Sequence, residues 1–192
     1  MQNITEKFDN LYKKINTQGF LRMEALGGEI PFYIAAYEAK QELEIQQAIP
    51  LLKKKLAANG INVLELNLFD IACELMEANG GIEKMFRVEQ KRSKDKFLRA
   101  LQSTLNMHKR LMPALAQKIE TANAKVYFLT GIGQVFPFIR SHNVLNNLQN
   151  IAKEAPTVIF FPGIYNGNDL NLFGLMKDDN YYRAFNMETV EP

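Results

Sequence analysis

The sequence predicts an α/β protein in which a mostly parallel sheet of about four to five strands is flanked by helices. Two continuous apolar runs, 126–129 and 158–161, are typical of strands that are buried on both faces of a parallel sheet. Segments with helical periodicity separate these and two further strand-like runs, as crossover connections between parallel strands require. We therefore expect three layers, with a helical insertion at about 82–122.

Hydrophobic spacing defines the elements expected in the first third of the chain. Residues 3–16 repeat apolar side chains at helical spacing, and the apolar, aromatic run 30–37 is typical of a strand. Helical spacing returns over 41–58, where Pro50 predicts a kink or a new first turn. Gly60 then marks the end of this helix.

The middle of the chain is expected to be mainly helical. A strand over 61–68 is followed by a helix from about 69, which two glycines at 80 and 81 should end. Helical spacing then continues through three segments, 82–92, 94–110 and 113–122. These segments form the expected insertion.

Turn signals organise the end of the chain. A short helix is expected between the two buried strands. Asn166-Gly167 lies between the short apolar runs 164–165 and 170–172, a combination that predicts a β-hairpin. Residues 181–187 are expected to add an edge strand. Because no repeat or linker interrupts the chain, we expect a single domain over 1–192.

Composition indicates a cytoplasmic protein. The chain has 192 residues and one cysteine, which cannot form a disulfide within the chain and so fits a reducing compartment. The first residues are polar and lack the apolar region of a signal peptide. No apolar run approaches the ~20 residues that a membrane helix needs. We expect a soluble protein without a membrane segment.

The loop after the strand at 126–129 is a natural place for a ligand, because α/β sheets bind ligands at the carboxyl ends of their strands. Gly131 and Gly133 begin like a dinucleotide fingerprint, but Phe136 stands at the third glycine position. The lysine and hydroxyl of a P-loop are also missing. A tight turn explains the glycines, and an unconventional phosphate site using Arg140 and the next helix N-terminus is the alternative.

The same loop supplies our candidates for binding a partner, which are Phe136, Phe138, Arg140 and His142. Two phenylalanines around the rigid Pro137 are suited to insert into a partner as apolar anchors, or to fold back over the core as a lid. His142 follows Ser141, but adjacency in sequence does not make a nucleophile and base. Helix capping by Ser141 or Asn143 is the simpler expectation.

No combination of residues predicts catalysis. Two histidines and one cysteine, far apart in sequence, do not match a zinc site. Asp169, Asp178 and Asp179 lie among asparagines, where turns are the common explanation and a magnesium site is the alternative. Cys73 falls within an expected helix and is interpreted as a small buried hydrophobe. We expect a protein that is not an enzyme and that has no cofactor or metal.

Positive charge is concentrated in one segment. Residues 84–110 carry nine Lys or Arg against two Asp or Glu, although the whole chain has a net charge of only +2. The candidates for a basic surface are Lys84, Arg87, Lys91, Arg92, Lys94, Lys96 and Arg99. A solvated helical face, an acidic protein partner and nucleic acid remain open. Few aromatic residues interleave with these charges, which disfavours single-strand stacking.

Five strings of the sequence carry a family likeness. They are VLELNLFD at 63–70, VYFLTGIGQVFPFIRSHNVLNNL at 126–148, FFPG at 160–163, LFG at 172–174 and KDDNYYRAF at 177–185. Together they resemble the BrxB family, small components of BREX bacteriophage-exclusion systems. The likeness spans nearly the whole chain, and the second and last strings are its most specific parts.

This resemblance implies a bacterial, cytoplasmic, non-enzymatic assembly component of a BREX system. There it would support host DNA methylation and phage restriction beside a DNA methyltransferase, an AAA+ ATPase and PglZ. A PglZ-type protein is the first-choice partner, and DNA would be reached indirectly. By analogy, the fold would be a RecA-like or Rossmann-like core without a phosphate loop. A degenerate nucleotide-binding protein and a DNA-contacting subunit using 84–110 are the alternatives.

Overall fold

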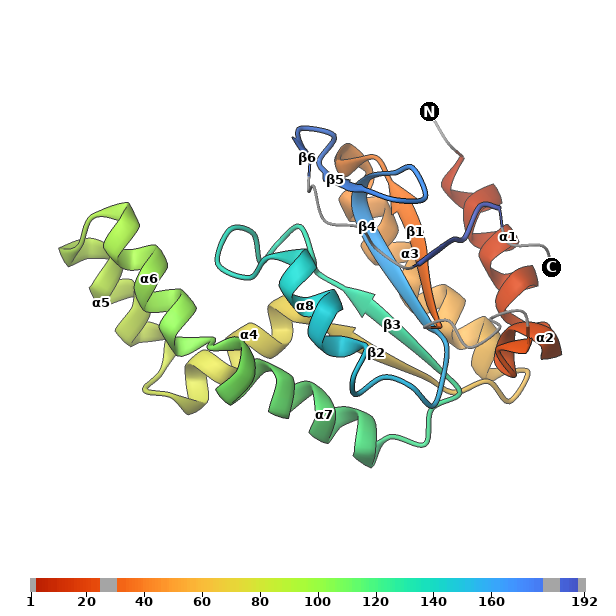
Figure 1. Ribbon diagram of the computed structural model, residues 1–192, viewed down its shortest axis with the longest axis horizontal. Helices are drawn as coiled ribbons and strands as arrows, with labels where there is room; N and C mark the ends of the chain where they lie inside the picture. Colours follow the sequence, from red (N-terminus) through yellow and green to blue (C-terminus); the bar gives the residue numbers. More distant parts are fainter. Residues whose placement is uncertain (1–2, 25–30, 178–183, 190–192) are drawn as a thin grey trace.

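The central sheet is parallel, as the sequence predicts (Figure 1). The computed structural model describes residues 3–24, 31–177 and 184–189. Five strands run in the order β2-β3-β4-β1-β7, and each pair of neighbours in this order is parallel. These strands are β1 (Phe32–Tyr37), β2 (Val63–Asn67), β3 (Val126–Thr130), β4 (Thr157–Tyr165) and β7 (Phe185–Asn186).

The position of β1 distinguishes this sheet from a Rossmann sheet. In the Rossmann order the first strand pairs with the second, whereas β1 here pairs with β4 and β7. The end of β4 forms an antiparallel hairpin with β5 (Leu170–Leu172), which pairs in turn with β6 (Met176–Lys177). This confirms the hairpin that Asn166-Gly167 predicts.

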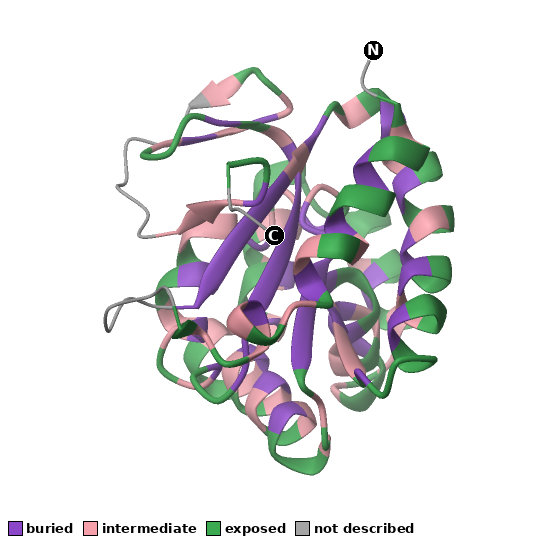
Figure 2. Ribbon diagram, turned by 90° about the vertical axis from the view of Figure 1, so that its right-hand side faces the viewer, coloured by how far each residue is buried: buried purple, intermediate pink, exposed green. Residues whose placement is uncertain are grey.

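Both faces of the sheet are buried (Figure 2). Along β1, Phe32 and Ile34 enter one core, while Tyr33, Ala35 and Tyr37 enter the other. β3 and β4 alternate in the same way. Continuous apolar runs are needed for such strands because neither face meets water. The three-layer architecture follows directly from them.

Three helices cover the first face, and their apolar sides pack on the core that holds Tyr33. They are α1 (Ile4–Ile15), α2 (Gln18–Leu21) and α3 (Glu42–Ala57). A short 3-10 turn, η2 (Ala39–Gln41), connects β1 to α3. Pro50 does not begin a new helix, because α3 runs through it with Pro50 on the exposed side. That alternative of the sequence prediction was wrong.

Helices α4 (Leu68–Ala78), α7 (Met112–Thr121) and α8 (Ser141–Leu148) cover the second face. Asn67 begins α4 by accepting hydrogen bonds from the backbone N–H groups of Phe69, at 3.0 Å, and Asp70, at 3.3 Å. Among the helices that the structure describes, none is long and apolar enough to cross a membrane.

The expected insertion is helical and begins with α5 (Ile82–Lys91) and α6 (Lys94–Thr104). These two helices form a hairpin that extends away from the sheet (Figure 1). The prediction of one helix over 94–110 was wrong, because α6 ends at Thr104 and a π-helix, η3 (Met107–Leu111), follows. The side chain of Asn106 caps that new helix by accepting a hydrogen bond from the Lys109 N–H at 2.9 Å.

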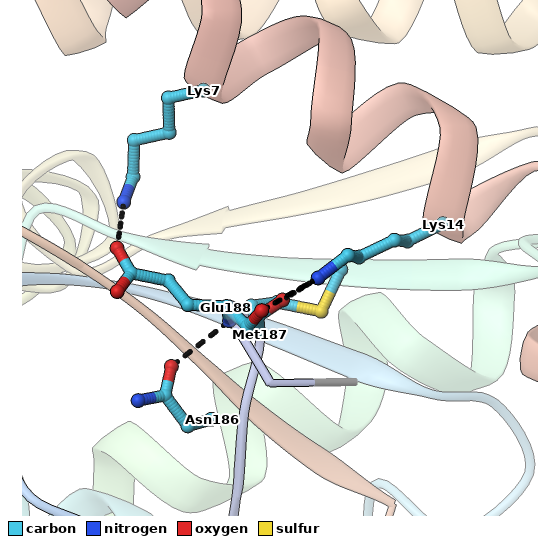
Figure 3. A network of polar contacts seen from close by, with 5 residues as sticks. All are labelled: Lys7, Lys14, Asn186, Met187 and Glu188. Atoms are coloured by element: carbon cyan, nitrogen blue, oxygen red, sulfur yellow. Dashed lines mark hydrogen bonds and ion pairs between the residues drawn. The ribbon is translucent and has the colours of Figure 1, made fainter. Parts of the chain in front are cut away.

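Polar contacts tie the end of the chain to its beginning (Figure 3). Lys14 Nζ donates to the carbonyl oxygens of Met187, at 2.7 Å, and Glu188, at 2.9 Å. Lys7 Nζ lies 3.2 Å from the Glu188 carboxylate, with only 5% of the Lys7 side chain exposed. Burial lowers the pKa of Lys14. These contacts hold β7 beside β1, which confirms the predicted edge strand at 185–186, whereas 181–183 lie outside the described residues.

Candidate functional site

The loop between β3 and α8 opens onto a cleft of about 380 Å³, which we call the α6–α8 cleft. Leu98 and Gln102 of α6 form one wall. The opposite wall is formed by loop and α8 residues Phe136, Pro137, Arg140, Ser141 and His142. Its floor consists of apolar side chains from β4, β5 and β6, among them Phe161 and Leu172. Three of the four partner-binding candidates therefore meet at one place.

The two phenylalanines of the loop have different roles. Both are half-buried and pack against the core. Phe136 lines the cleft and meets the ring of Phe173 edge to face, with 6.3 Å between ring centroids. Phe138 does not line the cleft. Pro137 between them is exposed and follows a cis peptide bond. Phe136 therefore packs against the core and also contributes surface to the cleft.

The polar groups of the cleft are positive or neutral. Arg140 is exposed at its rim, and no carboxylate occurs among the described residues that line it. Arg140 is also the N-cap residue of α8, and among the described residues its side chain makes no capping hydrogen bond. The expected capping by Ser141 or Asn143 was therefore wrong. A helix N-terminus without a capping side chain carries partial positive charge, which adds to that of Arg140.

Packing explains both glycines of the loop. Gly131 has a φ of +74°, and a Cβ there would overlap the Asn67 side chain that caps α4. A Cβ on Gly133 would lie 3.0 Å from the rings of Phe173 and Pro162. The tight turn expected from the sequence is thus required by close packing on both sides.

A second pocket, of about 300 Å³, lies at the carboxyl ends of β1, β2 and β3, and we call it the carboxylate pocket. Its acidic lining residues are Glu42, Glu65 and Asp70. Tyr37 donates a hydrogen bond to Glu42 at 2.6 Å, and burial, together with Glu42, raises the pKa of Tyr37 above its usual range. Phosphates would meet carboxylates here, so the geometry does not favour a nucleotide.

Glu65 is the carboxylate of this pocket for which the structure records an ion pair. Lys53 Nζ lies 2.7 Å from its Oε2 atom, and the Thr130 hydroxyl donates to its Oε1 atom at 3.0 Å. Both partners come from elements that pack around the pocket, α3 and the end of β3. The charge of Glu65 is therefore balanced within the molecule.

The described residues contain no group of His, Cys, Asp or Glu that is arranged to hold a metal ion. Asp169 belongs to a turn in which the Asn166 side chain accepts hydrogen bonds from the N–H groups of Asn168 and Asp169. Asp178 and Asp179 lie outside the described residues. Burial raises the pKa of the Cys73 thiol, so Cys73 lacks the low pKa of a reactive thiolate.

The basic-surface candidates lie on the hairpin of α5 and α6. All are exposed, and among the residues that the structure describes none forms an ion pair with a carboxylate. Lys84, Arg87 and Lys91 are spaced three and four residues apart and share one side of α5. Their charge is directed to solvent rather than balanced internally.

Sequence reasoning missed the walls that complete the α6–α8 cleft. Leu98 and Gln102 belong to the insertion, and Leu170, Leu172 and Met176 belong to the terminal hairpin. No local pattern distinguishes these residues from ordinary core residues. They meet the β3–α8 loop only because the insertion and the hairpin converge on one face of the sheet.

Comparison with known proteins assigns the family. The family model described as "BREX protein BrxB" matches residues 64–187. A BREX protein BrxB of Bacillus cereus (strain H3081.97) is 36% identical over 97% of this chain and 98% of its own length. One of Escherichia coli O9:H4 (strain HS) is 29% identical over 94% and 90%. No solved structure matches the chain. The chain belongs to the BrxB family of BREX proteins.

Proposed function

We propose that this protein is a non-enzymatic assembly component of a BREX complex and that it binds the PglZ-type protein. Through this contact it supports host DNA methylation and phage restriction. Family membership supplies the system, and the open α6–α8 cleft supports binding as the activity. Its apolar floor and Arg140 are suited to holding a partner, whereas catalysis would need a paired nucleophile and base or a metal.

Co-purification tests this proposal most directly. The tagged chain is expressed with the untagged BREX proteins of its own system and washed at physiological salt. We expect the PglZ-type protein to be retained, with the methyltransferase and the AAA+ ATPase following through it. A tagged unrelated protein of similar charge is the control. Retention of no BREX protein would refute the proposal.

DNA contact through α5 and α6 is a second candidate, and one observation favours it. The hairpin extends away from the sheet (Figure 1). It carries exposed basic residues that form no ion pair with a described carboxylate. Helices with unpaired Lys and Arg bind the DNA backbone by releasing counterions, so such binding weakens steeply as salt increases.

Replacing four basic residues tests this candidate. The variant carries Lys91, Arg92, Lys94 and Lys96 as alanine. If the hairpin binds DNA, affinity should fall for all sequences, and its salt dependence should flatten by about one unit of slope per lost phosphate contact. Alanine replacement of Lys13, Lys54 and Lys153, which are exposed outside the hairpin, is the control. Parent affinity that is insensitive to salt would contradict the candidate.

A further inference from the structure

We infer that the α6–α8 cleft is a docking site for an acidic segment of a partner protein that inserts one apolar side chain. This inference rests on the proposed function for the identity of the partner, but its chemistry comes from the cleft alone. The floor selects the apolar side chain, and the rim selects the acidic residues beside it.

The floor of the cleft is a finished apolar surface. Phe161 is fully buried and Leu172 is 6% exposed, so the core of the second face holds this floor in place. Burial of this kind fixes the shape of the floor before a partner arrives, so little conformational freedom is lost on binding. The accessible apolar surface of the cleft comes from the half-buried Leu98, Phe136 and Met176. The volume of about 380 Å³ falls within the range of about 300–1,000 Å³ that is typical of ligand pockets. An aromatic or aliphatic side chain suits this floor.

Charge complementarity selects the residues that flank the apolar side chain. Arg140 is exposed at the rim, and no described carboxylate pairs with it or lines the cleft. Lys94, four residues before Leu98, shares the side of α6 that carries Leu98 and Gln102, although it does not itself line the cleft. A guanidinium binds a carboxylate through two parallel hydrogen bonds, which gives both strength and orientation.

The combination argues against nucleic acid as the occupant. Phosphates would use Arg140 and the N-terminus of α8, but they would leave the half-buried apolar lining of Leu98, Phe136 and Met176 exposed to water. An acidic peptide with an apolar side chain covers the floor and neutralises the rim together. Phe136, which is half-buried beside the floor, then forms the wall against which the inserted side chain packs.

The first arm of the test uses labelled peptides and does not depend on any BREX protein. One peptide has a phenylalanine between glutamates, a second has alanine in place of phenylalanine, and a third has glutamine in place of the glutamates. We expect fluorescence anisotropy to show binding of the first peptide and at least about tenfold weaker binding of the others, because each has lost one of the two recognised features. Equal binding of all three, or of none, would overturn the inference.

The second arm places the peptide on the cleft. Arg140→Glu should weaken binding of the first peptide and of the PglZ-type protein by about tenfold or more, since a charge-assisted hydrogen bond becomes a repulsion. Arg87→Glu is the matched control, because Arg87 is exposed on α5 and does not line the cleft. It should change binding less than about twofold, as expected for a charge outside an interface.

The two arms separate the inference from the proposed function. If the first peptide binds through Arg140 but no BREX protein is retained, the docking site stands and the proposed partner is wrong. If the PglZ-type protein binds the parent and the Arg140→Glu variant equally, the partner stands and the cleft is not its site. Self-association that Arg140→Glu abolishes would overturn it in favour of a second copy.

Discussion

Two pockets of this molecule lie close to the same end of the sheet and handle charge in opposite ways. In the carboxylate pocket, Lys53 and Thr130 satisfy Glu65 and Tyr37 satisfies Glu42. In the α6–α8 cleft, Arg140 has no described carboxylate beside it, and the first turn of α8 has no capping side chain. Balanced charges stabilise a fold, whereas an unbalanced charge beside an apolar floor is available to a partner.

The two pockets also differ in their position on this α/β scaffold. Open α/β sheets bind ligands beyond the carboxyl ends of their strands, and the carboxylate pocket holds that position. The residues that line it include an ion-paired Glu65 and a hydrogen-bonded pair, Tyr37 and Glu42. The α6–α8 cleft lies instead where the insertion and the terminal hairpin meet the β3–α8 loop.

The largest expected effect comes from removing one phenylalanine from each pocket. Phe160 lines the carboxylate pocket, is 1% exposed and packs on Phe8 and Phe128. Phe160→Ala should reduce the free energy of unfolding by about 3–5 kcal/mol, the usual cost of a large cavity in a core. Phe136→Ala should cost less, about 1–2 kcal/mol, because Phe136 is only half-buried.

Chemical denaturation of both variants measures this difference in stability. The affinity of each variant for the PglZ-type protein then shows whether Phe136 also contributes to binding. If Phe136 is an anchor, Phe136→Ala should weaken binding by about 2 kcal/mol or more. Equal losses of stability in the two variants would place Phe136 in the core and remove the anchor. Unchanged stability together with unchanged affinity would exclude both roles.

A smaller effect is expected when the balanced charge is removed. Glu65→Gln keeps an oxygen for the Thr130 hydroxyl but loses the ion pair with Lys53, so the free energy of unfolding should fall by about 1–2 kcal/mol. Glu44→Gln on the exposed side of α3 is the control, and it should stay within about 0.5 kcal/mol of the parent. If the two variants have the same free energy of unfolding, the charge of Glu65 does not stabilise the fold.

The smallest expected effect is that of nucleotides. Millimolar ATP or GTP, with and without magnesium, should give no saturable heat and no shift of the melting temperature, because Glu42, Glu65 and Asp70 line the pocket at the strand ends. Calorimetry and a melting curve measure this. A saturable heat would contradict the comparison and revive the alternative of a degenerate nucleotide-binding protein.

The sequence was sufficient to predict those elements whose structure depends on residues that are neighbours in the chain. The buried strands at 126–129 and 158–161 were predicted because continuous apolar runs fit few other environments. The hairpin at Asn166-Gly167 was predicted because Gly167 supplies the positive φ that the turn needs. The β3–α8 loop was a candidate site because ligands bind at strand ends.

Long-range packing decides the parts that were missed. β4 continues through Pro162 to Tyr165, although proline argues against a central strand, because the Pro162 carbonyl accepts a hydrogen bond from Phe173. The break between α6 and η3 leaves no change in hydrophobic spacing. The cleft depends on the convergence of Leu98, Phe136 and Leu172, which no spacing rule connects.

The strand order dictates how this chain is built during synthesis. β1 leaves the ribosome early, but Phe32 pairs with Thr157 and Tyr33 pairs with Phe185, so both neighbours of β1 are made late. Until then the nascent chain carries an apolar, aromatic strand with two open edges, which is a natural target for chaperones. Loss of the last residues would leave one of these edges open in the finished protein. The late strand β7 covers one edge of the early strand β1. The contacts of Lys7 and Lys14 with Glu188 hold β7 in that place.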